Sequence, residues 1–177
     1  LVTRELTPEE KELAKQKQFF ASSVALAKDA IVVVTNKSNS DTVFGALALQ
    51  GILSDSYKKK YTVVVDNQNS SLFRTLSDSL MKGKTLGKHI YAAKNGQGVI
   101  DYVSKNPDAI GFASLCDVVD PNDSANLGNF ISNVNICAIH NDELKESFKP
   151  YMAYLGLKQY PLARKLYYVS RESYAGL

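Results

Sequence analysis

The sequence predicts an α/β protein in which helices pack against a largely parallel sheet. Two unbroken apolar runs rich in β-branched residues, Ala30–Val34 and Tyr61–Val65, predict strands that are covered on both faces. Between them, Thr42–Leu53 carries apolar residues at helical spacing, so the three segments form a strand, helix, strand unit. Helical and strand patterns then alternate along the chain before strand patterns accumulate near its end.

The first predicted helix has a complete start signal. Thr7 is an N-cap residue, Pro8 suits the first helical position, and Glu10 can return a hydrogen bond to the cap. A helix from Pro8 to about Gln18 is therefore expected ahead of the first strand.

The middle of the chain continues the alternation. Ser70–Leu80 places leucines and a phenylalanine on one helical stripe, and His89–Ala93 is a weak strand pattern. A helix opens at Asn95 and ends before Asn106-Pro107, because proline disfavours helical backbone in the residue before it. Ala109–Ala113 is the next predicted strand.

The last third of the chain reads as a loop followed by strands. Residues 117–133 are rich in Asp, Asn, Ser and Gly, which is typical of an exposed irregular loop. Val134–Ile139, Tyr151–Leu157 and Leu166–Ser170 are predicted strands.

Composition excludes several classes of function. The formal net charge is only +3, and the one dense basic cluster, Lys58–Lys60, lies in a predicted loop, so nucleic-acid binding is not expected. No stretch approaches the roughly 20 apolar residues that a membrane-spanning helix needs. No catalytic, nucleotide-binding or metal-binding motif is present, so we expect neither an enzyme nor a cofactor.

The cysteines and histidines carry no motif either. Cys116 and Cys137 lie on apolar segments and are expected to be buried thiols, with a disulfide as the alternative in an oxidising compartment. His89 and His140 are expected to have structural roles.

The most informative candidate site follows the strand that ends at Val65. Ligands of open parallel sheets gather at the carboxyl ends of strands, and a helix N-terminus offers free amides with a partial positive charge. A polar loop that contains Asn67 and Asn69 leads there into a helix headed by Ser70 and Ser71, with Arg74 one turn on. These residues could hold an oxyanion; in the alternative interpretation, Ser70 is only an N-cap and Arg74 is a solvated surface residue.

Two other places could contribute to binding. Thr3-Arg4 precede the first helix, and the arginine fork suits phosphate or carboxylate, although an arginine near a terminus is commonly a surface residue. Asn95 and Gln97 stand at another helix start, where capping is the simpler role.

Several segments together resemble the phosphate ABC-transporter substrate-binding protein family (PstS-like), especially its divergent lipoprotein members in Bacteroides-like bacteria. The resemblance covers nearly the whole chain, and its segments occur in the order of the family. They are Thr3–Glu10, Ala30–Asn39, Val65–Ser71, Val99–Val103, Asn106–Gly111 and Tyr160–Arg164.

The resemblance implies a periplasmic-binding-protein-like fold of type II, with two lobes joined by crossing strands that close on a ligand. It places residues 1–23 as a fragment of lobe I, residues 24–157 as lobe II with the crossover strands, and residues 158–177 as the return into lobe I. Relative to the family, an N-terminal part and a C-terminal helix are expected to be missing from this chain. It further implies a periplasmic or cell-envelope location with a lipid anchor in the full-length protein.

Residue by residue, the match at the binding loop is incomplete. Ser70 matches the serine of the family's Ser-Gly-Thr helix start, but Ser71 and Leu72 replace its glycine and threonine. Asp66 stands where the family has an arginine, and its carboxylate would repel a dianion. Thr3 and Arg4 match the pair that reaches the ligand from lobe I, so Arg4 could restore the lost positive charge.

The resemblance implies the substrate-binding component of an ABC transporter for phosphate or a related small oxyanion, with the permease as its partner. It implies no bond chemistry. The alternative is a non-transport surface interaction or sensing protein that keeps the fold but has lost phosphate binding; Asp66 and Leu72 favour it.

Overall fold

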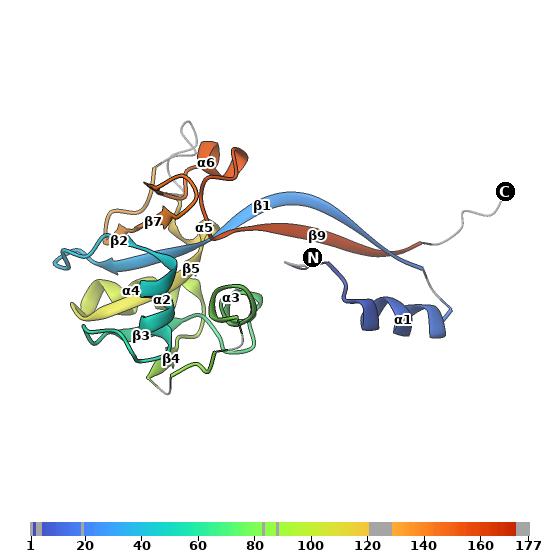
Figure 1. The fold of residues 1–177 in the computed structure, drawn as a ribbon, viewed down its shortest axis with the longest axis horizontal. Coiled ribbons are helices and arrows are strands. Elements are labelled where there is room, and N and C mark those ends of the chain that lie inside the picture. Colours follow the sequence, from blue (N-terminus) through green and yellow to red (C-terminus); the bar gives the residue numbers. More distant parts are fainter. Residues whose placement is uncertain are drawn as a thin grey trace. The chain divides into compact units, whose positions relative to one another are not determined.

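The computed structural model describes residues 2, 5–18, 20–82, 84–87, 89–120 and 129–172 (Figure 1). The chain divides into two compact units. Unit 1 consists of Leu1–Asp29 and Arg164–Leu177, and unit 2 of Ala30–Ala163. The predicted α/β class is confirmed, whereas the assignment of residues to lobes stays a prediction.

Unit 2 is built around a twisted sheet with the strand order β4-β3-β5-β1-β6, in which β9 also pairs with β1. The strand β3 is parallel to β4 and β5, whereas β1 is antiparallel to β5 and β6. The bounds are β1 (Phe20–Asn36), β3 (Thr62–Val65), β4 (Ile90–Ala92), β5 (Ala109–Ser114), β6 (Val134–Ile136) and β9 (Ala163–Glu172). The three apolar strands predicted from the sequence are therefore present, and the weak one at 89–93 is confirmed as well.

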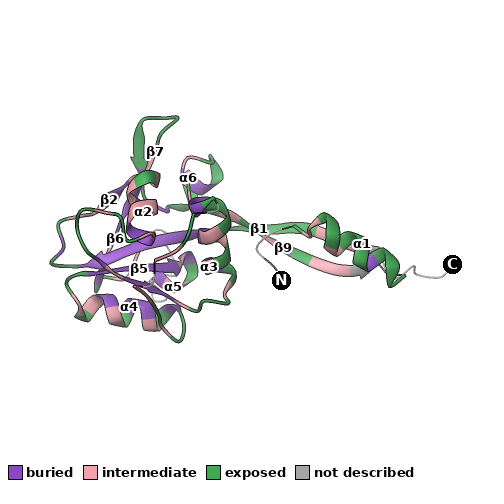
Figure 2. Cartoon of the chain, turned by 60° about the horizontal axis from the view of Figure 1, so that its bottom comes forward, coloured by how far each residue is buried: buried purple, intermediate pink, exposed green. Residues whose placement is uncertain are grey.

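Helices cover both faces of this sheet, and α2 and α4 lie on opposite sides of it in Figure 2. The helix α4 packs on β3 and β5 through Val99 and Val103, which are fully buried. The bounds are α2 (Ala46–Leu53), α3 (Ser71–Thr75), the π-helix η1 (Leu76–Met81), α4 (Gly96–Lys105) and α5 (Leu115–Val118). The helix predicted at Ser70–Leu80 thus forms, but its second half is a π-helix.

A second, three-stranded sheet with the order β2-β7-β8 completes unit 2, and its strand β2 occupies the start of the segment predicted as a helix from Thr42 to Leu53. It contains β2 (Val43–Phe44), β7 (Ala138–Asn141) and β8 (Glu146–Phe148). Val134–Ile139 is not one strand, because β6 ends at Ile136 in the large sheet and β7 begins at Ala138 in the small one. Tyr151–Leu157 is not a strand but contains α6 (Met152–Gly156), in which only Leu155 is buried.

Unit 1 contains α1 (Pro8–Gln16), the outer part of β1 and most of β9. The predicted capping box forms, since Thr7 and Glu10 exchange side-chain hydrogen bonds with each other's backbone amides. The helix ends two residues earlier than predicted, because Gln18 adopts a left-handed backbone conformation with φ of 55°. Val2 forms a bridge to Tyr167 in β9.

The cysteines and the basic cluster have structural explanations. Both cysteines are free thiols; Cys137 is buried as predicted, and burial raises its pKa to about 11. Cys116 is exposed on α5, so its predicted burial was wrong, since the short helix turns it away from the core. In the basic cluster, Lys59 pairs with Asp41 and Lys60 with Asp55, each at 2.8 Å, which is typical of a solvated loop.

Alkaline pH is expected to weaken this fold through Tyr61. Its hydroxyl donates to Asp41, and burial raises its pKa from 10.0 to about 12. The neutral phenol of Tyr61 is therefore favoured more in the folded state than in the unfolded state. Its contribution to the free energy of unfolding is fully present below pH 10 and is lost as the pH rises toward 12. Urea unfolding at pH 8, 10 and 11 should show a smaller loss of unfolding free energy for Tyr61→Phe than for the parent. Equal losses in the two proteins would contradict this assignment.

Candidate functional site

Three loops meet at one edge of the large sheet. The parallel strands β3 and β4 pair Val65 with Ala92, where both end, and β3 and β5 pair Val65 with Phe112, two residues before β5 ends at Ser114. The amide of Ala93 also donates to the carbonyl of Val65 at 2.7 Å. The loops that follow these strands lead into α3, α4 and α5. This carboxyl edge is where open parallel sheets bind ligands.

The turn between β3 and α3 is organised by its own polar groups. The Asn67 side chain accepts from the amide of Asn69 at 2.8 Å, and its carbonyl accepts from the amide of Ser70 at 3.0 Å. The Ser70 hydroxyl caps the helix by accepting from the amide of Phe73 at 3.0 Å. Ser70 is thus an N-cap, as one interpretation of the sequence predicted.

Asp66 adds a second bond to this cap. One carboxylate oxygen, Oδ1, accepts from the Ser70 hydroxyl at 2.6 Å and from the amide of Asn67 at 2.7 Å. The hydroxyl proton of Ser70 is therefore already donated to Asp66, and an anion that accepts this hydrogen bond must displace the Asp66 carboxylate. In the described part of the chain, no lysine or arginine lies within ion-pair distance of this carboxylate.

Two backbone donors of the turn have no acceptor within the described part of the chain, and one of them belongs to Leu72, which is only 2% exposed. Among the residues that the structure describes, none accepts a hydrogen bond from the amides of Ser71 and Leu72, the first two of the helix. The side chains of Asn67, Asn69, Ser71 and Arg74 are exposed. Five residues predicted as ligand contacts, Asn67, Asn69, Ser70, Ser71 and Arg74, therefore lie in the β3–α3 turn and in α3 itself, whereas Thr3 and Arg4 lie outside the described residues.

The starts of the two neighbouring helices, α4 and α5, lie at the same edge, and α5 carries a second carboxylate there, that of Asp117. Asn95 caps α4 by accepting from the amide of Gly98 at 2.9 Å, and Gln97 donates to Asp101, so both have local structural partners. Asp117 accepts from the amide of Ser114 at 3.1 Å in a capping box. Its carboxylate lies against Gly96, where a Cβ atom would overlap it, so any other residue at this position would displace the Asp117 side chain.

Sequence reasoning noted the charge of Asp66 but missed its hydrogen bonds, and it missed Asp117 altogether. The signal for Asp117 was available, since Ser114 and Asp117 have the spacing of a capping box. The hydrogen bond between Asp66 and Ser70 has no comparable signal, because it depends on the path of the intervening loop.

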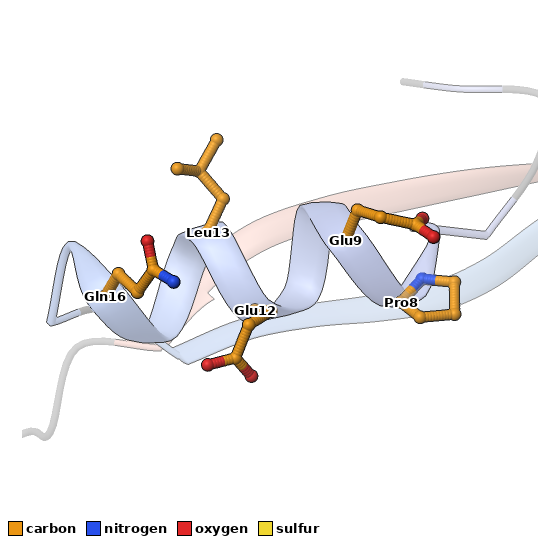
Figure 3. Close-up of a pocket in the computed structure, with 5 residues that line it drawn as sticks. All are labelled: Pro8, Glu9, Glu12, Leu13 and Gln16. Atoms are coloured by element: carbon orange, nitrogen blue, oxygen red, sulfur yellow. The ribbon is translucent and has the colours of Figure 1, made fainter.

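Unit 1 carries a shallow hollow along one face of α1 (Figure 3). Its lining repeats at the spacing of helical turns and includes two carboxylates, which do not favour an anion. The lining residues are Pro8, Glu9, Glu12, Leu13 and Gln16. Among the described residues there is also no group of His, Cys, Asp and Glu that could hold a metal ion.

Comparison with known proteins identifies the kind of fold. A family model described as "PBP superfamily domain" matches residues 1–177. An ABC-type phosphate transport receptor from Vibrio cholerae superposes with a TM-score of 0.73 at 19% identity, over 98% of this chain and 67% of that protein. A putative phosphate ABC transporter substrate-binding protein from Clostridium perfringens, with bound phosphate, superposes with a TM-score of 0.70 at 17% identity, over 97% of this chain and 65% of that protein.

The fold also occurs outside transport. The regulatory domain of a LysR family regulator from N. meningitidis superposes with a TM-score of 0.57 at 12% identity, over 96% of this chain and 61% of that protein. No curated protein matches the sequence significantly. Within the described residues, no helix is both long and apolar enough to span a bilayer. The predicted periplasmic-binding-protein-like fold is thus confirmed.

Proposed function

This chain belongs to the PBP superfamily domain family, and on that premise we propose that it binds phosphate or a related small oxyanion for an ABC transporter. The observation that carries the proposal is the pair of amides, those of Ser71 and Leu72, that have no acceptor among the described residues at the carboxyl edge of the sheet. The two phosphate-transport proteins that share the fold support this ligand class. Binding and release by opening and closing need no bond chemistry, so the protein is proposed to be a carrier and not an enzyme.

The proposed binding set combines backbone and side-chain donors. The amides of Ser71 and Leu72 would bind the anion together with the side chains of Asn67, Asn69, Ser70 and Ser71. Arg74 would add a positive charge from the exposed side of the same turn. Thr3 and Arg4 are proposed to contribute from unit 1, and Arg4 to balance the charge of Asp66.

The partners and the location follow from the same premise. We propose that the protein delivers its ligand to the membrane subunits of an ABC permease and acts in the periplasm or at the cell envelope, held by a lipid anchor. The chain spans only 67% and 65% of the two transport proteins, so these whole-protein properties remain part of the proposal.

Calorimetric titration of inorganic phosphate into the purified protein tests the proposal. Saturable binding is expected, and Arg74→Gln should weaken it several-fold, because a charge-assisted contact contributes about 1.5–3 kcal/mol when fully formed and less when exposed. Lys105→Gln is the matched control, since Lys105 is an exposed basic residue in the last turn of α4, at the opposite edge of the sheet. Absence of binding by the parent, or equal effects of the two substitutions, would contradict the site.

The second candidate function is a sensing or surface interaction protein that keeps the fold without phosphate binding. The observation that favours it is the Asp66 carboxylate, which already holds the Ser70 hydroxyl and the Asn67 amide. The LysR family regulatory domain shows that the same fold also occurs in a regulator. A protein of this kind would fold normally and give no heat with phosphate.

A further inference from the structure

The chain passes between the two compact units at two places, and an ion pair within unit 1 lies at these two crossing points. Unit 1 ends at Asp29 in β1 and resumes at Arg164 in β9. Arg164 reaches Asp29 with two nitrogens, Nε at 2.8 Å and Nη2 at 2.6 Å, and both bind the same oxygen, Oδ2. The two connecting strands are therefore tied to each other at the position where the units divide.

This pair differs in its burial from the other ion pairs among the residues that the structure describes. The side chains of Arg164 and Asp29 are only 8% and 10% exposed. Those of Lys59 and Asp41 are 44% and 41% exposed, and those of Lys60 and Asp55 are 72% and 49% exposed. Exposed ion pairs contribute little to holding two segments together. Removing one partner of a buried pair leaves the other charge buried without a partner or water, which is strongly destabilising.

Further bonds tie the same two segments within unit 2. The amide of Ile31 donates to the carbonyl of Leu162 at 3.0 Å, and the Tyr160 hydroxyl donates to the carbonyl of Ile31 at 2.9 Å. Tyr160 is 2% exposed, so its bond is shielded from water. The ion pair thus continues a series of cross-links between the segment at residues 29–31 and the segment at residues 160–164.

We propose that the Asp29–Arg164 pair is a clamp that holds the two connecting strands as one ribbon and so limits the relative movement of the two units. A two-stranded ribbon is pliable by itself, because few side chains pack on it. The planar arginine fork resists twisting, because it binds through two nitrogens at fixed angles, which the point charge of a lysine does not do. The clamp acts on the chain itself and does not depend on whether an anion is bound.

Electron–electron distance measurements on the full chain test the clamp. Spin labels would be placed at Glu12→Cys in α1 and Lys105→Cys in α4, both exposed, in a Cys116→Ser background that leaves only the buried Cys137. Arg164→Lys keeps the charge and removes the fork, and Asp29→Leu with Arg164→Met replaces the pair by apolar side chains that can preserve stability. Both variants should widen the distribution of distances between the labels.

Hydrogen exchange distinguishes a clamp from general stabilisation. In both variants the amides near residues 31 and 162 should exchange on the order of 10–100-fold faster, while the amides of β3 and β5 keep their protection. Lys60→Gln, which breaks an exposed pair, should change neither measurement. A distance distribution as narrow as the parent's in both clamp variants would overturn the proposal, as would a uniform loss of protection without widening.

Discussion

Replacing Gly111 by alanine is expected to lower the free energy of unfolding by about 1–3 kcal/mol, because the core has no room for a methyl group there. Gly111 lies in β5, which packs against α4. A Cβ atom built on it would lie 2.6 Å from Val99 Cγ1, 2.8 Å from Val103 Cγ2 and 2.9 Å from Val34 Cγ2. These three valines are fully buried and β-branched, so they can neither move into solvent nor change rotamer freely.

Gly156→Ala is the matched control for this substitution. No heavy atom lies within 4 Å of a Cβ built at Gly156, near the end of α6, so alanine should be neutral or slightly stabilising there. Urea unfolding of the parent and both variants gives the comparison. A loss below about 0.5 kcal/mol for Gly111→Ala would mean that α4 moves away from the sheet at little cost, and that close packing at β5 does not fix the helix.

Asp66→Asn is expected to raise the affinity for phosphate roughly fivefold or more, because one unit charge about 4 Å from an anion contributes about 1 kcal/mol of repulsion even in a water-like dielectric. Asparagine can still accept from the Ser70 hydroxyl and the Asn67 amide through its own oxygen, so the turn should keep its shape. The substitution therefore removes charge without removing the cap.

Asp108→Asn controls for net charge, since Asp108 is exposed just before β5, at the edge of the sheet away from the site. It should leave the phosphate affinity unchanged. If Asp66→Asn instead weakened binding, Asp66 would be an acceptor for a proton on the ligand and not a competitor of the ligand. If neither the parent nor Asp66→Asn bound phosphate, the sensing or interaction function would be the better account.

Much of the fold could be predicted from local sequence because its main strands are buried on both faces. The apolar runs at Ala30–Val34, Tyr61–Val65 and Ala109–Ala113 admit few other structures in a protein with a packed α/β core. The capping box at Thr7 and Glu10 fixed the start of α1 in the same way.

The sequence-based predictions fail where a strand is too short to show a hydrophobic pattern, or where tertiary contacts determine the secondary structure. The strands β2 and β8 have two and three residues, which is too few for an alternation to show. The segment at Tyr151–Leu157 is apolar throughout, and such a run fits a strand or a helix equally well until packing selects one side chain, here Leu155, for burial. The outer part of β1, from Phe20 to Asp29, carries mixed polar and small residues, and its strand structure comes from pairing with β9.

In the candidate site, too, some features could be predicted from local sequence and others could not. The serine-headed turn could be located from sequence because the strand end and the N-cap both leave local signals. The bond from Ser70 to Asp66 could not, because it depends on how the loop of Asn67–Asn69 folds back on itself.

The position of β1 in the sheet has a consequence for biosynthesis. The strand leaves the ribosome early, yet it pairs with β5, β6 and β9, and the Tyr160 hydroxyl that binds Ile31 is translated 129 residues later. At roughly 5–20 residues per second, that interval is about 6–26 s, and the apolar stretch from Ile31 to Val34 lacks at least one of these partners until it ends. Nascent chains should therefore depend on a chaperone during this delay, even though the finished protein hides the same stretch completely.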